Sequence, residues 1–370
     1  MMTEILALKP ADASAREVPG PRIRLSGVAD DRAMMRAAAE LTRDLQKPKP
    51  WLYWTDCLVS AAIGYAALIG AVMAPTVAWA LLACVVSVLA LYRATLFIHE
   101  ITHVKHSLLP GFRVGWNVLV GMPMMLPSFM YEGIHAIHHA RTRYGTAEDP
   151  EYLPLAHMKP YTLPLFLLVS VLMPVGLLIR FGILTPLSLL FPKLRRVVIA
   201  KYSGLQINPS YERKAPTGEF RKQWAFQETI CSIWAIGVIA TVATGIFPLG
   251  AFAIYMAVIA GVAVINQVRT LVAHLWENEG EPLTVTAQFL DSVNVPGPSW
   301  LPYFWAPVGL RYHALHHLLP SLPYHSLTEA HRRLSEALAT DSAYHKANYP
   351  TLTGLMVRLG RNTMKPRERN

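Results

Sequence analysis

The stretch CLVSAAIGYAALIGAVMAPTVAWALLACVVSVLALY, residues 57–92, contains no charged side chain over 36 positions. A helix needs about 20 apolar residues to cross a bilayer, so this stretch is long enough for two crossings. Pro75 lies near its middle, where a proline interrupts a helix because it has no N–H to donate. The stretch therefore predicts a helical hairpin that enters the membrane and returns to the same side.

A second stretch has the same character. Residues 229–268 carry no charge over 40 positions, and residues 247–250, Phe-Pro-Leu-Gly, break that stretch near its middle. The 370-residue chain is 53% hydrophobic. Its mean hydropathy is +0.30, too apolar for an ordinary soluble protein of this size. We therefore expect an all-α integral membrane protein with two transmembrane helical hairpins, about four spans in all.

The net charge of +10 is concentrated before the hairpins. Eight lysines and arginines lie between residues 16 and 49, and eight more lie between residues 193 and 222. Positively charged flanks mark the cytoplasmic side of a membrane protein, so the distribution of these lysines and arginines indicates the orientation of the hairpins in the membrane. The sequence shows no basic and aromatic pattern of the kind that would indicate a nucleic-acid partner.

Two further apolar segments contain several prolines each. Residues 114–131 predict a re-entrant or interfacial piece, and residues 160–192 predict an interfacial or kinked hairpin segment. We divide the chain into three parts on this basis. Residues 1–48 form a polar, partly disordered cytoplasmic N-terminus, residues 49–340 a membrane domain with a cytoplasmic cap, and residues 341–370 a basic tail.

The histidines fall into three boxes. The first is FIHEITHVKH at residues 97–106, the second is GIHAIHHARTRYG from residue 133, and the third is RYHALHHLLPSLPYH from residue 311. Residues three or four apart project from one helical face, so each box can present its imidazoles together. Including one isolated histidine after the second hairpin, the candidate metal ligands are His99, His103, His135, His138, His139, His274, His313, His316 and His317, with His106 a possible addition.

HEITH within the first box fits HExxH, the signature of a zinc peptidase in which Glu100 would act as base. A catalytic zinc site uses three protein ligands and one open position, so nine histidines are too many for it. They suit two metal ions, although imidazole binds zinc, copper, iron and nickel alike. Cys57, Cys84 and Cys231 have no metal-binding or disulfide spacing and are expected to be small core residues.

The order HxxxH, HxxHH, HxxHH, interleaved with paired apolar hairpins, resembles the integral-membrane fatty acid desaturase and hydroxylase superfamily. The resemblance runs from about Trp51 to Leu338 and is most specific in YHALHHLLPSLPYHSLTEAHRRL. YGTAEDPEYLP, after the second box, is similar to bacterial members of this group. The resemblance implies a non-haem di-iron centre on the cytoplasmic face, with His274 matching the family's extra ligand before the third box.

Two departures separate this chain from acyl-CoA desaturases of that superfamily. Thr270 stands where some of them have an asparagine four residues before the extra histidine, and the nearest asparagine is Asn266. The first box also has three intervening residues where those relatives have four. Both differences favour the broader group of lipid desaturases. The low charge of the spans and the bacterial look of the second box favour a bacterial inner membrane, with the boxes on the cytoplasmic side.

The function that the resemblance implies is an O2-dependent lipid (fatty acyl) desaturase with two iron ions. The alternatives are a di-iron hydroxylase or ketolase of a carotenoid or other lipid, the zinc peptidase, and a metal-binding or transport protein. No motif for bound flavin, haem, dinucleotide or an iron–sulfur cluster is present. We therefore expect an external electron donor, a ferredoxin or cytochrome b5-type protein with its reductase, docking near residues 193–222.

Five carboxylates are candidates to accept hydrogen bonds from the outer N–H groups of the imidazoles: Glu100, Asp149, Glu151, Glu277 and Glu279. The sequence leaves open the chain length of the lipid, the carrier of the acyl group, desaturation against hydroxylation, and the oligomeric state.

Overall fold

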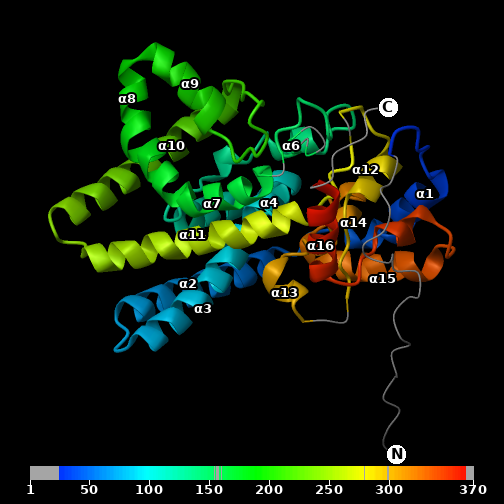
Figure 1. Ribbon diagram of the computed structural model, residues 1–370, viewed down its shortest axis with the longest axis horizontal. Coiled ribbons are helices and arrows are strands. Elements are labelled where there is room, and N and C mark those ends of the chain that lie inside the picture. Colours follow the sequence, from blue (N-terminus) through cyan, green and yellow to red (C-terminus); the bar gives the residue numbers. More distant parts are fainter. Residues whose placement is uncertain are drawn as a thin grey trace, which may run out of the picture.

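The computed structural model describes residues 25–153, 155, 158–159, 161–278, 280–297 and 300–363. Within these residues the regular elements are all helices, accompanied by three isolated β-bridges. Long helices extend toward the left of Figure 1, and a cap of short helices and loops lies at the right. The all-α fold class predicted from the sequence is confirmed.

The first predicted hairpin consists of α2 (Pro50–Val72) and α3 (Val77–Thr95). The turn between them contains Pro75, and the Thr76 side chain caps α3 by accepting a hydrogen bond from the N–H of Trp79. The two charges that bound the apolar stretch pair with each other: Arg93 donates to Asp56 from Nε at 2.6 Å and from Nη2 at 2.5 Å. The hairpin thereby neutralises both charges where its two helices meet.

The second predicted hairpin consists of α10 (Gly218–Ala243) and α11 (Leu249–Leu271). Residues 244–248 form the turn, at the break that the sequence predicts. α11 packs against α2 and α3, so the two hairpins form one bundle (Figure 1). By length and composition, both helices of this hairpin could cross a membrane.

Residues 162–190 form a fifth helix long and apolar enough to cross, where the sequence predicts an interfacial or kinked segment and about four spans. It comprises α7 (Thr162–Ile179), the π-helix η6 (Arg180–Leu184) and α8 (Thr185–Leu190). The buried Arg180, the charge that interrupts this stretch, donates to Glu228 of α10 at 2.6 Å. That carboxylate also pairs with Arg195 at 2.7 Å. Sequence reasoning could not supply this partner for Arg180.

Residues 114–131 form no span, as predicted. They contain the end of α5 (Phe112–Trp116), the π-helix η3 (Asn117–Gly121) and the 3-10 turn η4 (Ser128–Met130). Broken backbone at membrane depth persists only where protein satisfies its polar groups. Here the Asn117 side chain accepts from the N–H of Ser128 at 2.8 Å and donates to its Oγ at 2.9 Å.

The remaining helices are short. They are α1 (Arg32–Leu41), η1 (Arg43–Leu45), α4 (Phe97–His103), η2 (His106–Leu108), α6 (His135–His138), α9 (Pro192–Tyr202), α12 (Val285–Asp291), α13 (Pro302–Trp305), α14 (His313–Leu318), η7 (Tyr324–Ser326), α15 (Leu327–Ala337), η8 (Ala343–Ala347) and α16 (Leu352–Thr363). Most of those after residue 271, together with α1, build the cap around a second apolar core.

The two terminal parts differ from the sequence-based division. Residues 1–24 lie outside the described residues, but α1 belongs to the cap, where it packs against α15. Residues 341–363 are folded and not a free tail, because Leu355 and Leu359 are buried in the core of the cap. Arg358 is buried too and donates from Nη2 to Glu277 at 2.6 Å. From the sequence alone, a basic stretch suggests a solvent-exposed tail, because the remote partner of a buried ion pair cannot be identified there.

Replacing Arg358 with methionine is expected to destabilise the cap. A buried ion pair that loses one partner leaves an uncompensated charge, which costs about 3–5 kcal/mol. The apparent melting temperature of the detergent-purified protein, followed by circular dichroism, should fall clearly in Arg358→Met. Arg361→Met, on the exposed surface of the same helix, is the matched control and should melt like wild type. Equal melting temperatures for both variants would contradict a stabilising role for the pair.

Candidate metal centre

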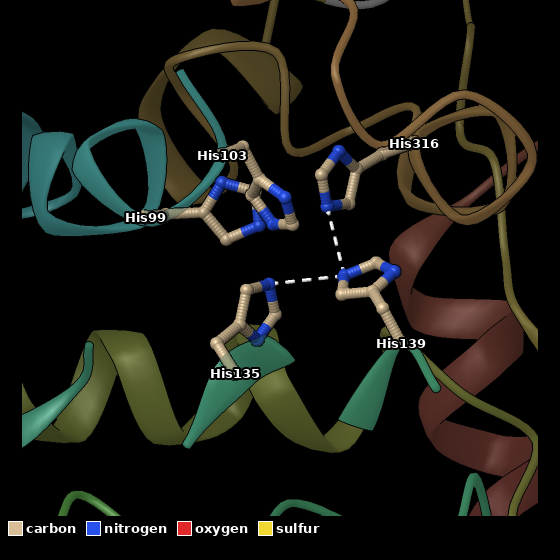
Figure 2. Close-up of side chains that lie close together, drawn as sticks. All are labelled: His99, His103, His135, His139 and His316. Carbon is tan, nitrogen blue, oxygen red and sulfur yellow. Dashed lines mark hydrogen bonds between the residues drawn. The ribbon is translucent and has the colours of Figure 1, made fainter. Parts of the chain in front are cut away.

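Nine histidines converge where the long helices meet the cap. They form a larger group of five and a smaller group of four, and within each group one ring nitrogen per residue lies within 4.8 Å of the others. The larger group is His99, His103, His135, His139 and His316, and the smaller group is His138, His274, His313 and His317. Figure 2 shows the rings of the larger group facing a common space, with His99 and His103 on one side.

Each HxxHH box contributes to both groups. The outer pair of the second box, His135 and His139, belongs to the larger group, while His138 belongs to the smaller one. The third box is divided the opposite way, with His313 and His317 in the smaller group and His316 in the larger. Residues four apart on a helix point in nearly the same direction, so each pair stays together and the third histidine points elsewhere.

Two histidines of the larger group come from a membrane helix. After a single break at Leu96, α3 continues as α4, which carries His99 and His103. The other candidate ligands come from the short helices α6 and α14 and from the segment after α11. The centre therefore forms only when the bundle and the cap are assembled together.

Asn294 holds two parts of the cap in register. Its backbone N–H donates to Ala347 at 2.8 Å, and its backbone carbonyl accepts from Tyr349 at 2.8 Å. Its side-chain oxygen accepts from the N–H of Leu315 at 3.0 Å, which fixes the first turn of α14. The neighbouring Ser292 forms a β-bridge with His274. One buried segment thus positions both the isolated histidine and the third box.

Carboxylates hold the outer nitrogens of two histidines. His138 Nδ1 donates to Asp149, whose two oxygens lie at 2.9 and 3.1 Å, and His135 Nδ1 contacts Glu151. Asp149 is itself fixed by backbone N–H groups of Gly145 and Glu151, each at 2.8 Å. Gly145 has a φ of +69°, a conformation that favours glycine, so the YGTAEDPE turn shapes this contact.

Tyrosines hold the outer nitrogens in a second way that the sequence analysis missed. The Tyr144 hydroxyl donates to Asp291 at 2.9 Å and lies 2.9 Å from His274 Nδ1, so its oxygen accepts the imidazole N–H. The Tyr152 hydroxyl also donates to Asp291, at 2.7 Å. Tyr131, four residues before His135, lies 2.9 Å from its Nδ1. Only this last spacing offered a signal in the sequence.

These outer contacts fix the protonation of the inner nitrogens. When His138 and His274 are neutral, these contacts favour the tautomer with the proton on Nδ1, in which both Nε2 atoms present lone pairs. The two Nε2 atoms nevertheless lie only 3.2 Å apart, and His274 Nε2 lies 3.0 Å from that of His313. In the larger group, His139 Nε2 lies 3.0 Å from His135 and 3.1 Å from His316. Lone pairs this close repel unless a proton or a metal cation lies between them.

The residues fit two metal ions. Two imidazole nitrogens each about 2.1 Å from one ion would be roughly 3.0–3.4 Å apart at ligand angles of 90–110°. The Nε2 atoms of His99 and His103 are buried and without a hydrogen-bond partner within the described part of the chain. Burial lowers the pKa of His139, His313 and His317 well below the usual range, reinforced by neighbouring imidazoles. Neutral imidazole is the form that binds metals.

The other predicted residues lie elsewhere. His106 belongs to neither group, and its side chain is 46% exposed. Glu100 is not placed to act as a peptidase base. Its Oε2 accepts hydrogen bonds from the Tyr53 hydroxyl at 2.6 Å and from the N–H of Tyr324 at 3.1 Å. Its other oxygen is 3.6 Å from His99 Nδ1, too far for a hydrogen bond. Glu277 pairs with Arg358, and Glu279 lies outside the described residues.

A cavity of about 410 Å³ reaches the larger group. At one end it is lined by His99 and by Tyr131 and Glu151, the two partners of His135. Burial raises the pKa of Glu151 to about 7, although the hydrogen bond with Tyr131 and the charge of Arg269 oppose this effect. The rest of the wall comes from α3, α7, α11 and residues 201–207; many of its side chains are apolar, and it also includes Arg180 and Lys201. An apolar molecule in this cavity would touch the centre at its inner end.

The chain matches the family described as fatty acid desaturase over residues 75–348, which include all nine histidines. It is also 47% identical over 346 residues to a protein of Caulobacter vibrioides (strain NA1000 / CB15N) called ceramide hydroxylase. That alignment covers 94% of this chain and 97% of the relative. No solved structure gives a significant match.

These similarities refine the sequence-based interpretation. They indicate an oxidoreductase that acts on a lipid, and they do not specifically support the desaturation that the sequence analysis preferred. The family match begins in the turn of the first hairpin and covers α3, the whole second hairpin and most of the cap. This chain belongs to the fatty acid desaturase family, within the membrane desaturase and hydroxylase superfamily of di-iron enzymes.

Proposed function

We propose that this protein is an O2-dependent di-iron hydroxylase of a ceramide-like lipid. The observation that carries the proposal is the 47% identity to a ceramide hydroxylase along nearly the whole of both chains. The closely spaced lone pairs of the two histidine groups support the metal centre. The second candidate is a desaturase of the same kind of lipid, which the family match favours equally.

The proposed reaction is R–H + O2 + 2 e⁻ + 2 H⁺ → R–OH + H2O. Two iron ions held by the nine histidines would supply the activation of O2 that attack on an unactivated C–H bond needs, since no side chain has that oxidising power. The electrons would come from an external ferredoxin or cytochrome b5-type donor. The basic surface at residues 193–222 is our candidate docking site, at the cytoplasmic face of a bacterial inner membrane.

The chain's own residues orient the ligands and keep the centre dry. Asp149 and Glu151 hold the second box, and the Asp291–Tyr144 pair holds His274. Seven of the nine histidines are buried, which excludes bulk water from the centre. Such outer partners fix both the ring orientation and the tautomer of a metal-binding histidine.

Metal content tests the centre directly. Purified wild type is expected to hold about two irons per chain, one for each histidine group. His99→Ala and His316→Ala remove ligands that lie far apart in the sequence but share the larger group, so both should lose iron. His106→Ala is the matched control and should keep the wild-type content, because His106 belongs to neither group. One zinc per chain, retained in His316→Ala, would instead support the peptidase.

Asp149→Asn tests the outer contacts. It keeps the size of the side chain but weakens the acceptor for His138 Nδ1, and loss of such a partner typically costs 10- to 100-fold in metal affinity. Competition with an iron chelator should therefore strip Asp149→Asn at lower chelator concentration than wild type. Glu148→Gln, at the exposed neighbouring position, should behave like wild type. Identical stripping of all three proteins would argue against the role of Asp149.

Product analysis distinguishes the two candidate reactions. Wild type supplied with a ceramide, reduced donor and labelled O2 should give a product that has gained one oxygen atom from O2. A desaturase would give a product that has lost two hydrogens and contains no labelled oxygen. Mass spectrometry of the extracted lipid measures both outcomes, and the second would replace hydroxylation with desaturation.

A further inference from the structure

The cap carries an exposed aromatic patch at α13, whose members are Trp300, Leu301, Tyr303 and Phe304. Phe304 is the least exposed of the four, at 47%, and Trp300 the most exposed, at 68%. Among the described residues after Leu271, the other large hydrophobic side chains that are exposed are Met356 and Val357 of α16. Large apolar side chains gathered in one place on a surface mark an interaction site, so the patch needs a partner.

The aromatic patch rests on ordered contacts. The rings of Trp300 and Phe304 meet edge to face, with their centroids 5.6 Å apart. The guanidinium carbon of the buried Arg311 lies 4.6 Å from the centre of the Tyr303 ring. Trp305, the last residue of α13, packs against both apolar cores. The patch therefore sits on a fixed base and keeps its apolar side chains exposed in a defined arrangement.

A contact between α13 and α3 sets the depth of the patch relative to the membrane. The Tyr92 hydroxyl donates to the backbone carbonyl of Trp305 at 2.8 Å, and Figure 1 shows α13 at the edge of the cap next to α3. Tyr92 is the last residue of the charge-free stretch 57–92, and the next residue, Arg93, pairs with Asp56. The hydrocarbon core of a bilayer disfavours charge, so the first charges of a span lie near its headgroup region. The patch thus lies close to the boundary between acyl chains and headgroups.

The composition of the patch suits that boundary. Tryptophan and tyrosine are enriched at membrane–water interfaces, because the ring is apolar and its N–H or O–H can stay hydrated. Trp51, 65% exposed, lies in the first turn of α2, at the same end of the bundle as the ion pair between Asp56 and Arg93. In water the patch would leave most of its apolar surface hydrated, whereas insertion into a bilayer removes that surface from water.

We propose that the aromatic patch inserts into the membrane leaflet that faces the cap and anchors the cap to the bilayer. The partner of this surface is lipid at the boundary between acyl chains and headgroups. The chain runs from α13 through Arg311 directly into α14, so the anchor also holds the segment that carries the third histidine box. This inference goes beyond the proposed function, because a hydroxylase and a desaturase would use the same anchor.

Nitroxide labels on single cysteines test the insertion in the full chain. Trp300→Cys and Phe304→Cys are made separately in a Cys84→Ala background, since the other native cysteines, Cys57 and Cys231, are buried. Glu336→Cys, on the charged and exposed face of α15, is the matched control. Each labelled protein is placed in vesicles of phosphatidylcholine and phosphatidylglycerol. Power-saturation electron paramagnetic resonance then measures collisions of the label with O2, which concentrates among acyl chains, and with a water-soluble nickel chelate.

The two labels in the patch should gain collisions with O2 and lose collisions with the nickel chelate relative to the label at position 336. Nickel collisions as frequent at positions 300 and 304 as at 336 would place the patch in water and overturn the anchor. Labels shielded from both reagents would place the patch against protein, as in a dimer of this chain, and would overturn it as well. The two labels are independent, so either one decides the outcome should the other variant fail to fold.

Discussion

Repulsion between imidazole lone pairs is the constraint around which this protein is organised. When His138 and His274 are neutral with their protons on the outer nitrogens, their inner nitrogens face each other as acceptors at 3.2 Å. A chain that folded into this arrangement without cations would bury several such contacts in a region of low dielectric. Metal ions held by the two groups would couple metal binding to folding at this site, because they would turn repulsion into coordination.

The two apolar cores supply the rigidity that this arrangement needs. One core fills the space between the hairpins and the segment that carries the first box, and the other fills the cap. The histidines lie between the two, with His99 contributed by the bundle and His313 by the cap. The ion pair between Glu277 and Arg358 connects α16 to the segment just after His274. The C-terminal helix is thus part of the support for the centre.

The first histidine box shows how a short motif can mislead. HEITH has the spacing of a zinc peptidase, and His99 and His103 do share one group as that motif requires. Three more histidines complete the group, however, and Glu100 is engaged with Tyr53 and Tyr324. Glu100 of α4 therefore connects α2 and η7 through hydrogen bonds, and it is not available as a peptidase base.

The sequence by itself determined the all-α membrane fold, the two hairpins and the nine histidines that converge. Absence of charge, proline breaks and i, i+3, i+4 spacing are local properties, and local properties can be read directly from a chain. Only the tertiary structure decided how each HxxHH box is divided between the two groups. The spacing within one helix does not show which histidines from distant parts of the chain lie beside each ring. The sequence could not predict the ion pairs of Arg180 and Arg358 or the hydrogen bond between Tyr144 and Asp291. The physical reason is the same: a buried polar group is stable only with its partner, and each partner is remote in sequence.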